Sequence, residues 1–278
     1  MLAWGAALLI AFAIASVAYA LGALSRSGWM AAWGVGTLVF GCTEWWGAAV
    51  LLTFFVTSSF FSRLGRERKR TLVQEYAKGN ARDWGQVLAN GGLAAFLAAL
   101  ACLGIGADNL LRLGMVGALA AATADTWATE LGGFSLHPRS ILTGKPVVPG
   151  TSGGVSIAGT VAALAGGFLV AGVGLLPLPA GALGGAWNST SAWGVLVGGA
   201  LAGVLASTVD SFMGATVQGI YWCPHCQKET ERRVHRCGTS TVPYRGYRWV
   251  TNDVVNFVAT LVGAIIAIFV GRWAGWPI

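Results

Sequence analysis

The chain has 278 residues, of which 55% are hydrophobic and only 10% are charged, and its mean hydropathy is +0.65. So little polar material excludes a soluble globular protein of this size, because polar side chains must cover the surface of such a protein. The composition predicts an all-α, polytopic membrane protein. The net charge of +7 is explained by basic loops facing anionic lipid, and no nucleic-acid partner is predicted.

A membrane-spanning helix needs about 20 mainly apolar residues, and several stretches reach that length. Residues 2–24 lead into more apolar sequence, which indicates an uncleaved span and not a signal peptide. Residues 28–61 are too long for one span and predict two helices, with Glu44 at the outer interface. Five later spans bring the expected total to about eight transmembrane helices: 86–105, 110–132, 155–178, 192–215 and 253–273.

Lys and Arg gather in three predicted loops, 62–84, 133–152 and 216–251. Because basic residues favour the cytoplasmic side, we expect all three loops there and both termini outside. The whole chain, 1–278, is predicted to be one membrane domain. No transit segment precedes the first span, which favours a prokaryotic plasma membrane with the site facing the cytoplasm.

Two similar hexamers place an acid inside apolar sequence: Ala-Thr-Ala-Asp-Thr-Trp at 122–127 and Ser-Thr-Val-Asp-Ser-Phe at 207–212. A carboxylate at bilayer depth is costly unless it is paired, metal-bound or in a wet cavity. Asp125 and Asp210 are therefore predicted to be functional, at the cytoplasmic ends of two parallel helices; hydrogen bonding between helices is the alternative. Thr129 shares the face of Asp125, whereas Glu130 is expected to join only if the helix unwinds.

Two polar stripes enter the membrane beside the basic loops. The first comprises Arg82, Gln86 and Asn90 with Asp83 beside it, and the second comprises Asn252, Asn256 and Thr260 with Asp253 beside it. A spacing of four residues puts each stripe on one helical face. The stripes either line a site or bind helices to each other.

A basic, Gly-rich segment, Pro-Arg-Ser-Ile-Leu-Thr-Gly-Lys-Pro-Val-Val-Pro-Gly-Thr-Ser-Gly-Gly-Val-Ser, occupies residues 138–156 between the two acidic helices. Glycines let a backbone approach an anion, and amides that open a helix offer partial positive charge. The segment predicts a phosphate cradle in which Arg139 and Lys145 neutralise charge. It lacks the Walker ending, and an ordinary membrane-entry turn is the alternative.

The acids and the phosphate donors together predict phosphoryl chemistry on a lipid substrate. Asp125 and Asp210, with Glu130 as a further candidate, are expected to hold Mg²⁺, which usually takes one or two carboxylates plus substrate phosphates.

The third loop carries a Cys/His cluster within residues 223–237: Cys223, Cys226, His235 and Cys237. Three thiolates and an imidazole are the ligand set of a closed tetrahedral zinc site. His225 is an alternative fourth ligand. Free thiols and redox chemistry are the other interpretations, and a cytoplasmic position disfavours a disulfide.

Five segments in order resemble the successive signatures of one integral-membrane family: Arg-Asp-Trp-Gly-Gln-Val-Leu-Ala-Asn-Gly at 82–91, Ala-Asp-Thr-Trp-Ala-Thr-Glu-Leu-Gly at 124–132, Pro-Gly-Thr-Ser-Gly-Gly-Val-Ser at 149–156, Asp-Ser-Phe-Met-Gly-Ala-Thr-Val-Gln at 210–218 and Asn-Asp-Val-Val-Asn at 252–256. It is the family of transmembrane protein 19 and the plant phytyl-phosphate kinase of vitamin E synthesis.

The resemblance implies a CTP-dependent kinase that converts a phytyl or geranylgeranyl-like monophosphate to the diphosphate. It also implies kinship with dolichol kinases and phosphatidate cytidylyltransferases. The Pro-Gly-His-Gly-Gly signature of the cytidylyltransferases is absent, which favours phosphoryl transfer over CMP transfer. A cation-coupled transporter, a lipid-alcohol kinase and a scaffold that recruits a partner through the Cys/His cluster are the alternatives.

The motifs and the resemblance together define the candidate site. Its catalytic candidates are Asp125, Asp210, Glu130 and Lys145. Its candidates for binding nucleotide or substrate are Arg82, Asp83, Asn90, Thr129, Arg139, Gly150, Thr151, Ser152, Gly153, Gly154, Ser156, Ser211, Gln218, Asn252, Asp253 and Asn256.

Overall fold

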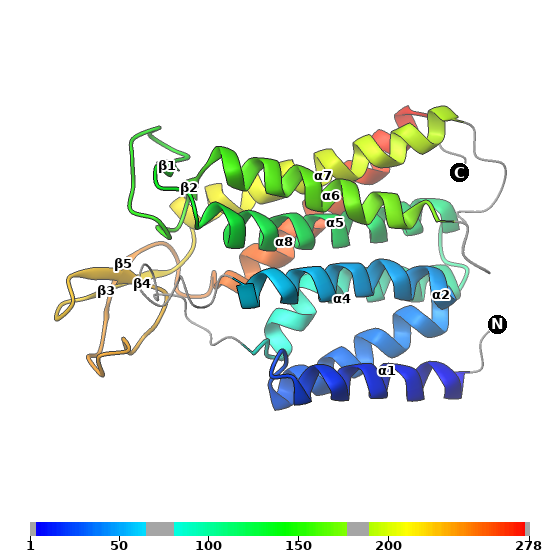
Figure 1. Ribbon diagram of the computed structural model, residues 1–278, viewed down its shortest axis with the longest axis horizontal. Coiled ribbons are helices and arrows are strands. Elements are labelled where there is room, and N and C mark those ends of the chain that lie inside the picture. The colour runs from blue at the N-terminus through cyan, green and yellow to red at the C-terminus, as the bar shows by residue number, and fades with distance from the viewer. Residues whose placement is uncertain (1–3, 65–80, 177–188, 276–278) are drawn as a thin grey trace.

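A computed structural model describes residues 4–64, 81–176 and 189–275, with side chains from residue 192 in the last range. The helices in these ranges are α1 (Trp4–Ala20), α2 (Arg26–Leu64), α4 (Trp84–Cys102), α5 (Asp108–Gly132), α6 (Ile157–Gly174), α7 (Ser189–Thr216) and α8 (Asn252–Trp273). They pack lengthwise into one bundle (Figure 1).

Five helical stretches are long and apolar enough to cross a membrane: α2, α4, α6, residues 192–216 of α7, and α8. They confirm the predicted class of a helical integral membrane protein. Helix α5 is not among them because it carries charged residues at both ends, yet its middle, from Leu113 to Ala124, is completely buried. The number of crossings and the side on which the loops lie stay predictions.

Helix α2 consists of two halves that meet at Glu44, whose backbone is non-helical (φ 53°, ψ −146°). Both ends of α2 lie beside the end of α1, because Arg63 Nη2 donates to the Leu21 carbonyl at 2.6 Å while Arg26 follows shortly after in the chain. The halves therefore run in opposite directions (Figure 1). Two helices were predicted here, and Glu44 lies at the bend between them.

Glycines let the central helix α5 approach its neighbours closely. A Cβ atom on Gly263 of α8 would lie 2.6 Å from the Gly117 carbonyl oxygen and 2.5 Å from Ala121 Cβ. Small residues at helix crossings allow this approach in membranes, where dispersion contacts replace the hydrophobic effect. The buried middle of α5 is thereby fixed against α8.

This crossing predicts that Gly263→Ala lowers stability by about 1–3 kcal/mol, the usual cost of overpacking. Gly34→Ala is the matched control, because nothing lies within 4 Å of a Cβ atom there and alanine favours a helix by about 1 kcal/mol. Thermal unfolding in detergent should give a lower Tm for the first variant only. Equal Tm values would contradict the packing.

Two small sheets lie at one end of the bundle, and the start of α1 and the end of α8 lie at the other (Figure 1). Strand β1 (Arg139–Ser140) pairs antiparallel with β2 (Gly154–Val155). Strand β3 (Ile220–Cys223) pairs antiparallel with both β4 (Lys228–Thr230) and β5 (Val242–Arg245). The second and third basic loops therefore have folded structure, which the helical prediction did not include.

Candidate functional site

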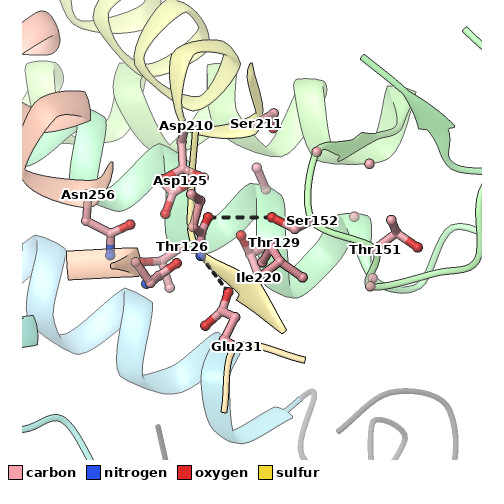
Figure 2. A pocket seen from close by; sticks show the side chains of 18 of the residues that line it. Asp125, Thr126, Thr129, Thr151, Ser152, Asp210, Ser211, Ile220, Glu231 and Asn256 are labelled. Carbon is pink, nitrogen blue, oxygen red and sulfur yellow. Dashed lines mark hydrogen bonds between the residues drawn. The ribbon is translucent and has the colours of Figure 1, made fainter. Parts of the chain in front are cut away.

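A cavity of about 1410 Å³ occupies the end of the bundle that carries the sheets. Helices α5, α7 and α8 supply one part of its wall, and the loops that contain β2, β3 and β4 supply another. Figure 2 shows side chains from these elements pointing into a common space. The cavity is thus bounded by the helix ends and by the basic loops together.

Most residues of the predicted site line this cavity: Arg82, Asn90, Asp125, Thr129, Glu130, Gly150, Thr151, Ser152, Gly153, Gly154, Ser156, Asp210, Ser211, Gln218, Asn252, Asp253 and Asn256. Three predicted residues are not among its lining: Asp83, Arg139 and Lys145. The structure therefore groups residues from five segments that are far apart in the sequence.

Four carboxylates form a connected group in the cavity, which we call the carboxylate cluster: Asp125, Glu130, Asp210 and Glu231. Asp125 interacts electrostatically with Glu130 and with Asp210, and Asp210 also interacts with Glu231. Figure 2 shows Asp125 and Asp210 next to each other. Like charges this close repel unless a cation or protons neutralise them.

Asp210 is held by the second polar stripe. Asn256 Nδ2 donates to Asp210 Oδ2 at 3.1 Å and to the Asn252 carbonyl at 3.3 Å when its amide nitrogen faces these acceptors. The third member of the stripe, Thr260, is buried and donates to the Ala89 carbonyl at 3.3 Å, which ties α8 to α4. The second stripe thus both lines the site and binds helices to each other, the two roles that its spacing allowed.

Glu130 corrects one expectation from the sequence. It was expected to reach the site only if α5 unwound, but α5 stays helical to Gly132 and Glu130 still lines the cavity. The reason is that the cavity extends around α5 toward Arg82, with which Glu130 interacts electrostatically. The site is broader than one helical face.

A chain of polar contacts links three segments across the cavity. Ser152 Oγ lies 3.5 Å from Gln218 Oε1, and Gln218 Nε2 donates to Glu231 Oε1 at 2.8 Å (Figure 2). Gln218 is only 3% exposed, so this chain is a buried strut. Sequence reasoning missed Glu231, and the only available signal was a pair of acids, Glu229 and Glu231, between the basic residues of the third loop.

The Gly-rich segment is anchored on the end of α7. Ser152 Oγ donates to the Gly214 carbonyl at 3.0 Å, and Gly153 (φ 83°) lies so close to Ala215 that a Cβ atom would collide with it. Ser156 caps α6 by accepting from the Gly159 amide at 3.1 Å. These contacts present residues 150–154 to the cavity as a fixed wall.

The three predicted residues that do not line the cavity lie in a strand, a turn and a helix cap. Arg139 lies in β1, and its Nη1 donates to the Gly144 carbonyl at 2.9 Å. Lys145 is exposed in the same turn. Asp83 caps α4: its Oδ1 accepts from the Gln86 amide at 3.0 Å, while its own amide donates to Gln86 Oε1 at 3.2 Å.

The third loop brings Cys223, Cys226, His235 and Cys237 together, with all four potential ligand atoms within 4.8 Å of one another. Across residues 4–64, 81–176 and 189–275, no other group of three or more His, Cys, Asp or Glu side chains is drawn together so tightly. His225, the alternative ligand, is not in the group. This Cys₃His group can therefore bind a metal ion.

The thiols of this group differ in acidity. Hydrogen bonds with Thr239 and His235 lower the pKa of Cys237 to about 5, so it is a thiolate at neutral pH. A hydrogen bond with Cys237 raises the pKa of Cys226 to about 11. A thiolate is the form that binds metals, so the loop already holds one ligand in that form.

Comparisons with known proteins give close relatives. The chain is 36% identical to Protein PGR of Arabidopsis thaliana over 276 residues, covering 94% of this chain and 93% of that protein. It is 28% identical to Protein VTE6, chloroplastic, of the same plant over 254 residues, covering 90% and 66%. An uncharacterized membrane protein of Methanocaldococcus jannaschii is 30% identical over 222 residues, covering 80% and 74%.

No solved structure matches the chain. The relatives include a chloroplastic protein, so they do not support the preference for a prokaryotic plasma membrane. The model of the family described as "Integral membrane protein DUF92" matches residues 9–264. The match confirms the membership that the five signature segments predicted: the chain belongs to the DUF92 family of integral membrane proteins.

Proposed function

We propose that this protein is a CTP-dependent kinase that converts a prenyl monophosphate to the diphosphate. The observation that carries the proposal is the carboxylate cluster, which faces a wall of hydroxyls and glycines in a cavity at the end of a membrane helix bundle. A phosphoryl-transfer site needs both the carboxylates and the wall, because carboxylates hold a metal ion and the wall binds phosphates. The resemblance to plant phytyl-phosphate kinase, within the family now established, supplies the substrate class.

The donor set fits Mg²⁺. Asp125 and Asp210 offer hard oxygen ligands next to each other, and the cluster is not a closed cage. Mg²⁺ usually binds through one or two carboxylates and completes its shell with water and substrate phosphates. When bound, it would neutralise charge on the transferred phosphoryl group.

Phosphoryl transfer from CTP to a prenyl monophosphate needs no general base. A phosphate monoester has its second pKa at about 6, so an oxygen of the prenyl monophosphate is already ionised at neutral pH. This oxygen forms a bond to the γ-phosphorus of CTP, and the bond from that phosphorus to the β–γ bridging oxygen breaks, giving CDP and the prenyl diphosphate. The carboxylates are thus free to act as metal ligands, which favours a monophosphate over a lipid alcohol.

The remaining lining positions these groups. Asn256 orients Asp210 through its hydrogen bond, while the wall at 150–154 provides the backbone amides of Ser152 and Gly153 for phosphate oxygens. The Thr151 hydroxyl holds the turn itself, because it donates to the Val148 carbonyl at 2.8 Å. The Ser152–Gln218–Glu231 strut sets the distance between this wall and the third loop. We further propose that Zn²⁺ fills the Cys₃His group, whose ligand number and types are those of structural zinc sites.

The decisive experiment uses the purified full-length chain in nanodiscs with Mg²⁺. With radiolabelled CTP and phytyl or geranylgeranyl monophosphate, we expect formation of the labelled diphosphate. ATP, GTP and UTP, tested in parallel, determine nucleotide preference, and the corresponding alcohols test lipid-alcohol kinase activity. Ion or substrate flux into liposomes without nucleotide consumption, in the absence of any diphosphate product, would replace the proposal with a transporter.

A further inference from the structure

A second hollow, of about 110 Å³, lies between α1, the two halves of α2, and α4. Its lining is apolar except at one end, where Arg82, Gln86 and Asn90 lie. The same three residues also line the large polar cavity. The two hollows therefore share one wall, and the apolar one, which we call the tail groove, extends from it along the bundle.

The tail groove reaches the outer surface of the bundle. Two of its lining residues, Ile14 and Trp45, are 38% and 48% exposed. From Phe55, beside Arg82, to Trp45 the groove follows ten residues of α2, or about 15 Å at 1.5 Å per residue. Small side chains such as Ala32 and Ala48 keep it open along this length.

Arg82 is fixed where the two hollows meet. Its amide donates to the Ala23 carbonyl and its carbonyl accepts from the Ser25 amide, both at 3.0 Å, which pins its backbone to the turn between α1 and α2. Its guanidinium lies over the Phe54 and Phe55 rings, 5.3 and 5.5 Å from their centroids. The Arg82 charge is thus held in place by backbone hydrogen bonds and by the two aromatic rings.

One nitrogen of this guanidinium is left for a ligand. Arg82 Nη1 is buried and has no hydrogen-bond partner in the described part of the chain. Burial lowers the pKa of Arg82 to about 10, which still leaves it protonated at neutral pH, and Glu130 partly balances its charge. A buried donor without a partner is costly, and a phosphate oxygen would satisfy both the donor and the charge.

We infer that the tail groove holds the isoprenoid tail of the prenyl monophosphate and that Arg82 Nη1 binds its phosphate where head and tail join. This inference rests on the proposed function for the identity of the head group. Because lipid is as apolar as the groove, tail binding gains little from the hydrophobic effect. The groove instead selects by shape and aims the phosphate at the carboxylate cluster.

The first test measures chain-length dependence. Ala48→Phe fills the groove about 10 Å beyond Phe55 at the rise of a helix, so kcat/KM for geranylgeranyl monophosphate should fall about tenfold or more while geranyl monophosphate is spared. Ala13→Phe is the matched control, because Ala13 is exposed on α1 and lines neither hollow. An equal loss for both chain lengths would overturn the inference.

The second test does not depend on turnover. A prenyl monophosphate with a photoreactive diazirine at the end of its tail should crosslink to α1, α2 and α4 residues of the groove in the full-length chain. Geranylgeranyl monophosphate should compete far better than geranylgeraniol, and Arg82→Gln should remove that difference. Crosslinks outside the groove, or undiminished preference for the monophosphate in Arg82→Gln, would overturn the inference even if the protein proves not to be a kinase.

Discussion

Asp125→Asn and Asp210→Asn should each lower the rate of prenyl diphosphate formation at least about a hundredfold, the scale expected when a catalytic metal loses a ligand. Asparagine keeps the shape of the side chain but removes the charge that would hold the proposed Mg²⁺. The two carboxylates interact with each other. If they hold one metal together, as proposed, the double variant should lose little more than either single variant. Single-turnover rates with saturating CTP measure this directly.

Metal binding gives a readout that does not need catalysis. Four interacting carboxylates repel one another in the metal-free protein, so removing one charge should leave the Tm unchanged or raise it. Mg²⁺ should raise the Tm of the wild type, because a ligand that binds only the folded state stabilises it. The same Mg²⁺ concentration should have no effect on either variant.

Asp108→Asn is the matched control on the same helix. Asp108 lies at the opposite end of α5, is 53% exposed, and pairs with Arg112 at 2.8 Å. Arg112 is only 14% exposed but also lies over the Trp46 ring, 5.3 Å from its centroid. This contact holds Arg112 in place without the pair, so activity and the Mg²⁺ effect should stay within about twofold of the wild type. Full turnover in both Asp125→Asn and Asp210→Asn would refute the metal assignment.

Removing the zinc proposed for the Cys₃His group should lower kcat about tenfold or more, the range seen when the residues that position a metal site are lost. The reason is geometric. Glu231 follows β4 directly and precedes His235 by four residues, so the fold of this loop sets the position of the carboxylate that Gln218 binds. Without the metal, the strut between the loop and the Gly-rich wall loses one end.

The measurement combines metal analysis with kinetics. The purified wild type should contain close to one equivalent of zinc, as one closed tetrahedral site requires, and Cys223→Ser should contain far less. Cys102→Ser is the matched control, because this exposed cysteine is outside the group, and it should keep both zinc and activity. A zinc-free wild type with full activity would show that the group has another purpose.

Several features of this protein follow from local sequence alone. Apolar stretches of span length and a scarcity of charge determine a helical membrane protein, and an acid inside such a stretch marks a site because burial there is costly. Asp125 and Asp210 could therefore be chosen as candidate site residues without a structure. The Cys/His cluster at 223–237 was also predictable, because its members lie within one short segment.

Tertiary structure decided which side chains meet. Glu130 joins the cavity because of the way neighbouring helices pack around α5, and Glu231 joins because β3 and β4 fold the third loop back over it. Arg139 donates to the Gly144 carbonyl and Lys145 is exposed in the same turn, because β1 pairs with β2 outside the cavity lining. Arg82 reaches both hollows because its backbone is pinned to the turn after α1. Spacing along the chain fixes the face on which a residue lies, but contacts between distant segments determine what that face meets.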